Sequence, residues 1–267
     1  MQLALDHVVQ TVPDLTAARA ALEGIGLRTV AGGRHVQWGT HNVLCHVGLP
    51  YIELLAVEDT AVAQTTAFGR GVLAEQARGA GIWRLALRTD DIERTASAVR
   101  DAGFRCTGPV PGHRARPDGS MLRWSLAFPE MSGGADLVPP MLIDWHEPDR
   151  ARLTGLIARG VADTSPRALI AGVAVACRDP KAVADWMHRA LGCAARETTT
   201  QKYGTALRIA LRGGDIFLCG GPLAPQVVLQ ALETRGERPF AVHLQAGREG
   251  VGGEVAIGGA HYTFEPI

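Results

Sequence analysis

The sequence lacks long apolar runs and local excesses of charge. No apolar stretch approaches the ~20 residues that a membrane-spanning helix requires. The 27 basic and 27 acidic residues give a formal net charge of zero, and no run of one sign stands out. Proteins that bind nucleic acids or membrane surfaces need a concentrated basic field. We therefore expect a protein that binds neither a nucleic acid nor a membrane.

Closely spaced cysteine pairs and phosphate-binding loops are also missing. The five cysteines are odd in number and never form a Cys-x-x-Cys pair. Most of them lie in apolar, strand-like segments, which favours buried free thiols in a reducing cytosol. Several Gly-Gly pairs occur, but none has the spacing of a phosphate loop that opens a helix. We expect a cytoplasmic protein without a nucleotide-binding fingerprint.

What the sequence does contain is a repeated unit. Three times, a short apolar strand leads through an Asp turn into a helix that ends at a glycine, with the strand and turn at 4–14, 83–91 and 171–179. In the first copy, three more strand-like segments follow the helix, and the second copy shares this layout. Such a recurrence indicates a repeated βαβββ unit, in which residues at equivalent strand positions face a shared cavity.

The repeats predict an α+β fold and a division of the chain. Residues 1–147 would form one domain of two modules, at 1–58 and 80–147. The segment 148–167 combines a short helix with a polar turn and is interpreted as a linker. Residues 168–267 would form a degenerate C-terminal pair of modules. A chain of 267 residues is long enough for one large domain or two smaller ones.

Three blocks of the first module resemble a known family. They are Leu5-Asp6-His7-Val8-Val9, the Gly32-Gly33-Arg34-His35 and Gly39-Thr40-His41-Asn42 segments, and Tyr51-Ile52-Glu53-Leu54. Together with the βαβββ repeat they resemble the glyoxalase-like branch of the vicinal oxygen chelate superfamily, over roughly residues 3–147. The resemblance implies cupped mixed sheets that enclose a cavity. It also implies a divalent metal bound by side chains from the first and last strands of two modules.

The first module supplies half of such a metal site. A strand alternates its faces, so His7 is expected to point to the concave side. Glu53 lies on the last strand of the same module, between two apolar residues that would face outward. An imidazole and a carboxylate on adjacent strands can chelate Zn²⁺, Mn²⁺, Fe²⁺ or Ni²⁺ and leave positions open for substrate oxygens.

The second module completes this site only in part. Counting from the Asp of each turn, Arg84 takes the position of His7, and Asp144 takes the position of Glu53. A guanidinium stays charged and cannot ligate a metal. The expected metal ligands are therefore His7, Glu53 and Asp144.

Other arrangements of these residues stay open. His35 or His46 could complete the ligand set, and a shift of one residue in the alignment would turn a neighbour of Arg84 inward instead. Without a metal, His7 would be a buried histidine that is hydrogen-bonded to Glu53. The two carboxylates would then pair with Arg84 in a structural or anion-binding network.

The expected substrate contacts come from the same blocks. Arg84 would bind a substrate carboxylate in a bidentate manner. The remaining residues that we expect at the substrate are His35, Trp38, Thr40 and Asn42.

The resemblance implies metal-assisted chemistry on a small oxygenated substrate, of the lyase, isomerase or dioxygenase type. The metal would polarise a carbonyl or an enediolate, and Glu53 would act as ligand or as catalytic base. The alternative is a non-catalytic protein that binds or sequesters a small molecule without metal, as bleomycin-resistance-type members of the superfamily do. Arg84 and the incomplete ligand set favour this alternative. Either protein would be a monomer or a homodimer.

Overall fold

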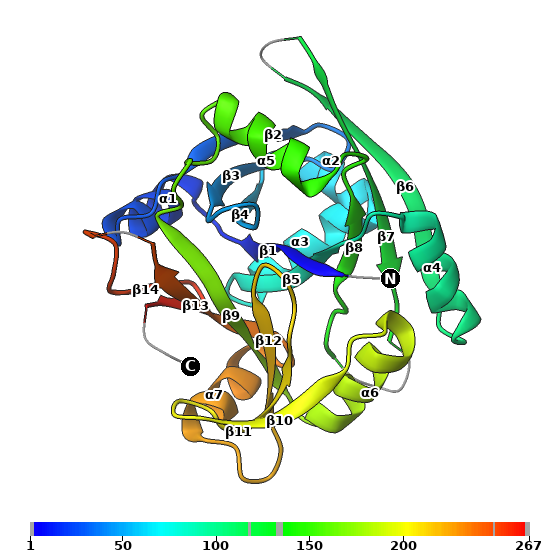
Figure 1. Ribbon diagram of the computed structural model, residues 1–267, viewed down its shortest axis with the longest axis vertical. Helices are drawn as coiled ribbons and strands as arrows, with labels where there is room; N and C mark the ends of the chain where they lie inside the picture. Colours follow the sequence, from blue (N-terminus) through cyan, green and yellow to red (C-terminus); the bar gives the residue numbers. More distant parts are fainter. Residues whose placement is uncertain (1–2, 117–118, 132–135, 248, 265–267) are drawn as a thin grey trace.

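Two curled mixed sheets form the centre of the molecule (Figure 1). The computed structural model describes residues 3–116, 119–131, 136–247 and 249–264. Within these ranges it contains 15 strands and seven helices. The α+β fold with cupped mixed sheets that the sequence predicts is confirmed. No helix in the described ranges is long and apolar enough to cross a membrane.

The N-terminal sheet has eight strands in the order β2-β3-β4-β1-β5-β8-β7-β6. At its centre β1 and β5 run antiparallel, and each of them has a parallel neighbour, β4 beside β1 and β8 beside β5. Two similar halves therefore meet at the β1–β5 pair. The strands are β1 (Ala4–Thr11), β2 (Val30–His35), β3 (Thr40–His46), β4 (Tyr51–Val57), β5 (Gly81–Arg88), β6 (Cys106–Ala115), β7 (Met121–Pro129) and β8 (Met141–Asp144).

The C-terminal sheet has seven strands in the order β10-β11-β12-β9-β13-β15-β14. It repeats the central pattern, because β9 runs parallel to β12 and antiparallel to β13. Its strands are β9 (Ala168–Cys177), β10 (Ala195–Thr200), β11 (Gly204–Ile209), β12 (Asp215–Gly220), β13 (Pro239–Ala246), β14 (Glu254–Ile257) and β15 (Ala260–Thr263).

The Asp turns of the repeat act as helix N-caps. The side chains of Asp14, Asp91 and Asp179 each accept one or two hydrogen bonds from backbone N–H groups in the first turn of the helix that follows. Gly192 ends α6 in the left-handed conformation, which glycine adopts without strain. The helices are α1 (Leu15–Gly24), α2 (Thr60–Thr65), α3 (Ala67–Ala77), α4 (Ile92–Asp101), α5 (Asp149–Ala158), α6 (Pro180–Leu191) and α7 (Gln226–Arg235).

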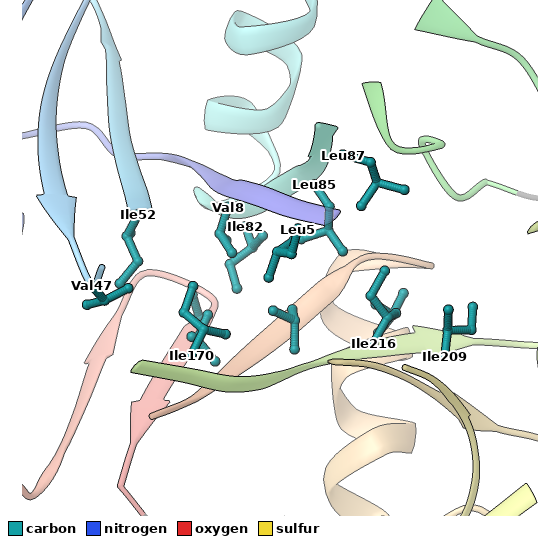
Figure 2. Close-up of a cluster of buried hydrophobic side chains, with 14 of the residues drawn as sticks. Leu5, Val8, Val47, Ile52, Ile82, Leu85, Leu87, Ile170, Ile209 and Ile216 are labelled. Atoms are coloured by element: carbon teal, nitrogen blue, oxygen red, sulfur yellow. The ribbon is translucent and has the colours of Figure 1, made fainter. Parts of the chain in front are cut away.

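The two sheets share one apolar core. Figure 2 shows Leu5, Val8 and Ile82 of the N-terminal sheet opposite Ile170 and Ile216 of the C-terminal sheet. All five side chains are buried. Because side chains alternate along a strand, the neighbours of these residues point to the opposite face of each sheet.

Helices cover the opposite face of each sheet, but not to the same extent. On the C-terminal sheet, Val228 of α7 packs with Tyr203, Phe217 and Phe240 in a cluster of buried apolar residues. On the N-terminal sheet, α3 packs against part of the face through Val72. Helix α5, from the segment predicted as a linker, lies in front of β2 and β3 (Figure 1). The space between α5 and the N-terminal sheet is where the site lies.

Candidate functional site

A cavity of about 450 Å³ lies on the covered face of the N-terminal sheet. Much of its wall is apolar and aromatic, and its titratable lining residues are His7, Glu53 and further histidines, glutamates and arginines. A pocket of this size and composition can hold a small organic molecule. The aromatic and large apolar residues include Trp38, Phe68, Trp124, Met141, Ile143 and Trp145.

His7 and Glu53 meet at the cavity because their strands are neighbours. Strands β1 and β4 pair in parallel, with His7 opposite Tyr51 and Val9 opposite Glu53. The imidazole Nε2 of His7 lies 3.6 Å from the Oε2 atom of Glu53. The ring of Tyr51 stacks on that of His7, with 4.4 Å between their centroids. Both His7 and Glu53 are buried, and both line the cavity.

A buried carboxylate orients the imidazole. The Nδ1 atom of His7 lies 2.7 Å from Oδ1 of Asp6, and Oδ2 of Asp6 accepts hydrogen bonds from Arg88 and Trp145. Burial alone would raise the pKa of Asp6, but Arg152, His7 and Arg88 together hold it far below its usual value. An ionised Asp6 at this distance requires a proton on Nδ1, and the other ring nitrogen, Nε2, faces Glu53.

The Gly-Gly block positions Glu53 through Asn42. The side-chain amide of Asn42 donates to Oε1 of Glu53 at 2.5 Å, and its oxygen accepts from the backbone N–H of Gly33 at 2.7 Å. A Cβ atom on Gly32 would lie 1.9 Å from this amide oxygen. Glycine at position 32 therefore allows the close approach of Asn42 to β2, and Asn42 in turn fixes the Glu53 carboxylate.

Of the four expected substrate contacts in this region, three line the cavity: His35, Trp38 and Asn42. Thr40 lies behind them, and its hydroxyl is 3.0 Å from Nδ1 of His35. Burial lowers the pKa of His35. Trp38 packs against Phe68 with 4.6 Å between ring centroids. Thr40 thus supports the position of His35 and does not itself face the cavity.

Arg84 is not among the residues that line the cavity. It pairs with Val9 across β1 and β5, but its guanidinium lies over the rings of Trp83 and Phe128, at 5.1 and 5.5 Å from their centroids. One guanidinium nitrogen donates to the carbonyl of Pro139 at 3.1 Å. Burial lowers the pKa of Arg84 to about 10. The expected substrate contact through Arg84 is not present in this arrangement.

Asp144 points away from the cavity. On β8 the lining residues are Met141 and Ile143, so Asp144 lies on the opposite face of the strand. Its carboxylate accepts hydrogen bonds from the backbone N–H groups of Ile92, at 3.3 Å, and His146, at 2.7 Å. The structure therefore does not bring Asp144 together with His7 and Glu53.

Strand register explains the position of Asp144. Val9 of β1 pairs with Glu53, and Ala86 of β5 pairs with Met141. Val9 and Ala86 lie the same number of residues before their helix caps, so Met141 is the counterpart of Glu53 in the second module. Loop lengths differ between the two modules, and counting along the sequence therefore chose Asp144.

The side chains at the cavity do not fit a chelated divalent metal. His7 and Glu53 offer two donors, whereas protein zinc sites use three or four protein ligands. The counterparts in the second module are Arg84 and Met141, and a guanidinium cannot ligate. Over the described ranges, no group of three or more His, Cys, Asp or Glu side chains is close enough to hold a metal ion.

The sequence analysis missed several residues that line this cavity. Arg152 comes from α5, Arg114 from β6, and Tyr51 begins β4. Arg152 is buried, with 4% of its surface exposed. A buried arginine in a short helix carries no pattern that separates it from a surface arginine. Tyr51 could have been found from the sequence, because it begins the Tyr51-Ile52-Glu53-Leu54 block on which the resemblance rests.

Comparisons with known proteins agree with this architecture. A hypothetical protein from Staphylococcus aureus has a TM-score of 0.80 at 21% identity, over 99% of this chain and 100% of that one. A mutant of 4-hydroxymandelate synthase from Streptomyces coelicolor has a TM-score of 0.62 at 16% identity, over 92% of this chain and 72% of that one. At these identities the likeness shows the fold alone. Among curated proteins, no match is found.

A family model decides the assignment. The model described as a glyoxalase-like domain matches residues 5–210, which is well over half of the chain. The matched range includes the whole cavity and the first strands of the C-terminal sheet. The chain belongs to the glyoxalase-like family of the vicinal oxygen chelate superfamily.

Proposed function

We propose that this chain binds a small, partly apolar oxygenated molecule in the cavity and transfers a proton at the His7–Glu53 pair. The observation that carries the proposal is this pair, 3.6 Å apart and buried, on the wall of a cavity with a largely apolar lining. Apolar surroundings strengthen the interactions of both groups with a bound ligand.

The chemistry of the pair suits proton transfer. Asp6 keeps the proton of His7 on Nδ1, so the lone pair of Nε2 faces the carboxylate of Glu53. At 3.6 Å the two atoms are too far apart for a direct hydrogen bond, so a polar group of a ligand can lie between the lone pair and the carboxylate. A ligand C–H or O–H group beside the pair can give up a proton to one member and regain it from the other. General acid–base catalysis of this kind contributes about 10²- to 10⁴-fold to a rate.

This proposal departs from the metal-assisted chemistry that the resemblance implies. The donor set at the cavity does not fit a chelated metal, so His7 and Glu53 would move the proton themselves. Many lyase and isomerase reactions begin with removal of a proton from carbon, which His7 and Glu53 could perform without a metal. Dioxygenase chemistry has no support in the side chains at the cavity. We also propose a cytoplasmic location for the protein, since all five cysteines are buried and unpaired, and a monomeric or homodimeric state.

A second candidate function is binding without chemistry. The largely apolar wall favours it, because such a wall can retain a ligand whether or not a proton moves. A sequestering protein would use the same cavity, with His7 and Glu53 as polar contacts only.

Hydrogen–deuterium exchange at ligand carbon separates the two functions. Protein treated with a chelator is incubated in D₂O with a set of small carbonyl compounds and carboxylic acids, and loss of C–H signals is followed by proton NMR. We expect exchange in at least one compound with the unmodified chain. His7→Gln and Glu53→Gln should each slow that exchange by about 10²-fold or more.

Arg150→Gln is the matched control, because Arg150 is exposed on α5 and does not line the cavity. This variant should exchange at the unmodified rate. Binding of a compound without any exchange would favour the sequestering function. Exchange that disappears on chelation and returns with added metal would contradict the proposal.

A further inference from the structure

We infer that Arg152 on α5 anchors an anionic group of the ligand, so that the cavity selects organic acids over their neutral analogues. This inference rests on the proposed small-molecule function. It adds a recognition residue from a helix outside the βαβββ modules.

Arg152 carries a buried charge that is not fully satisfied. Only 4% of its surface is exposed, and its Nη1 atom has no hydrogen-bond partner in the described parts of the chain. The nearest carboxylate oxygen is Oδ2 of Asp6, 3.8 Å from Nη1, which exceeds hydrogen-bond distance. The same oxygen already accepts hydrogen bonds from Arg88 and Trp145. A buried guanidinium nitrogen without a partner costs free energy, so a ligand that supplies a hydrogen-bond acceptor to Nη1 would be bound favourably.

The position of Arg152 places such an acceptor next to the His7–Glu53 pair. The guanidinium carbon lies 4.1 Å from the ring centroid of Trp145 and 5.9 Å from that of Tyr51. The ring of Tyr51 also stacks on the ring of His7, with 4.4 Å between the two centroids, so Tyr51 lies close to both Arg152 and His7. An acid held by Arg152 would therefore present its adjoining carbon atoms to His7.

His46 adds a second polar contact at the same place. Its ring lies 4.9 Å from that of Tyr51, and its Nδ1 atom is buried without a hydrogen-bond partner in the described parts of the chain. Like Arg152, it lines the cavity. The ring also makes a hydrogen bond to the backbone of Gly48, so the Nδ1 atom of this neutral imidazole offers a lone pair, and the charged contact to the anionic group comes from Arg152.

The charge of the lining favours an anion. Six lining residues are arginine or glutamate, and four of them are arginines. Of these four, Arg152 is the one that is buried. The others approach from the β6 strand and its loop and from the end of α5. The arginines are Arg114, Arg116, Arg152 and Arg159, and the glutamates are Glu53 and Glu147.

A carboxylate is the anion that matches these contacts. A planar guanidinium presents paired N–H donors that fit the two oxygens of a carboxylate. The aromatic wall beside it, with Trp124 and Trp145, suits a flat apolar body. The expected ligand is thus an aromatic or branched organic acid.

A pair of probes that differ only in charge tests the anchor. Binding of 2-naphthoate and of its uncharged analogue 2-naphthamide is measured by calorimetry at neutral pH. The unmodified chain should bind the acid at least tenfold more tightly. Arg152→Gln should weaken binding of the acid by about tenfold to hundredfold, the range for losing a charge-assisted hydrogen bond, and leave the amide within about threefold.

Two further variants keep the test decisive. Arg150→Gln removes an exposed charge from the same helix and should leave both affinities unchanged. Arg152→Lys keeps the charge without the planar fork, so it should retain a reduced preference for the acid even if Arg152→Gln fails to fold. Thermal melting of each variant reports folding.

The outcomes separate this inference from the proposed function. Equal binding of acid and amide by the unmodified chain, or a preference that survives Arg152→Gln, would overturn the anchor and leave the cavity as a binding site. If neither probe binds, the proposed small-molecule function itself fails.

Discussion

At the scale of single residues, burial decides what the titratable groups at the cavity can do. Burial lowers the pKa of His46 to about 3, so this imidazole is neutral in the folded protein over the physiological range. Asp6, in contrast, stays ionised because positive charges surround it. One neutral and one charged buried group thus flank His7.

His46 should make the protein less stable in acid. In the unfolded chain the pKa of His46 is near 6.5. Between about pH 6.5 and pH 3, His46 is therefore protonated in the unfolded state and neutral in the folded state. The free energy of unfolding therefore falls as the pH drops through this window, by at most about 1.4 kcal/mol per pH unit. Urea unfolding of the unmodified chain and of His46→Gln, at several pH values from 7 to 4, measures this contribution.

The variant should show a shallower dependence of stability on pH. His188→Gln changes an exposed histidine on α6 and should leave the slope as it is. An unchanged slope in His46→Gln would mean that His46 is not held neutral in the fold.

At the scale of elements, the strands and the helix caps could be predicted from the sequence. The residues that line the cavity could be predicted only in part. The start of three helices could be predicted from Asp14, Asp91 and Asp179, because a side-chain cap has a short, local sequence pattern. Asp144 was misplaced because the register of β5 and β8 depends on loop length, which counting cannot see. Arg152 was missed because a helix between two modules looks like a linker until the sheet behind it is known.

The contact between Gly32 of β2 and Asn42 of β3 can be tested by a single substitution. In Gly32→Ala the new Cβ would meet the Asn42 amide oxygen at 1.9 Å, so Asn42 must move and release Glu53. We expect a loss of about 1–3 kcal/mol in the free energy of unfolding, the usual cost of overpacking. Proton exchange should slow as well. Urea unfolding and the NMR assay measure the two effects.

Gly24→Ala is the matched control, because a Cβ atom at this last residue of α1 would meet nothing within 4 Å. Alanine there should leave stability unchanged or raise it by up to about 1 kcal/mol. Equal effects of the two substitutions would show that the Asn42 contact is unimportant.

At the scale of the whole molecule, a buried ion cluster joins the two sheets. Glu75 of α3 accepts hydrogen bonds from Arg235, at the end of α7, and from Arg238, just before β13. All three residues are buried. This cluster and the core shared by the two sheets indicate that residues 1–147 and 168–267 fold together.

Removing one member of this cluster should be costly. Glu75→Gln leaves the buried guanidinium of Arg235 without its carboxylate and leaves Arg238 with Asp136 at 3.7 Å, and we expect a loss of about 3–5 kcal/mol in the free energy of unfolding. Replacing Glu75, Arg235 and Arg238 together by apolar residues should recover much of that loss. Chemical denaturation of both variants tests the cluster. A loss below about 1 kcal/mol in Glu75→Gln would contradict its role.

We propose above that His7 and Glu53 form a polar centre that chelates no metal. Elemental analysis of tag-free protein, before and after reconstitution with Zn²⁺, Mn²⁺, Fe²⁺ or Ni²⁺, tests it most directly. We expect far less than one metal ion per chain, with no difference between the unmodified chain, His7→Gln and Glu53→Gln. One ion per chain that is lost in both variants would contradict it.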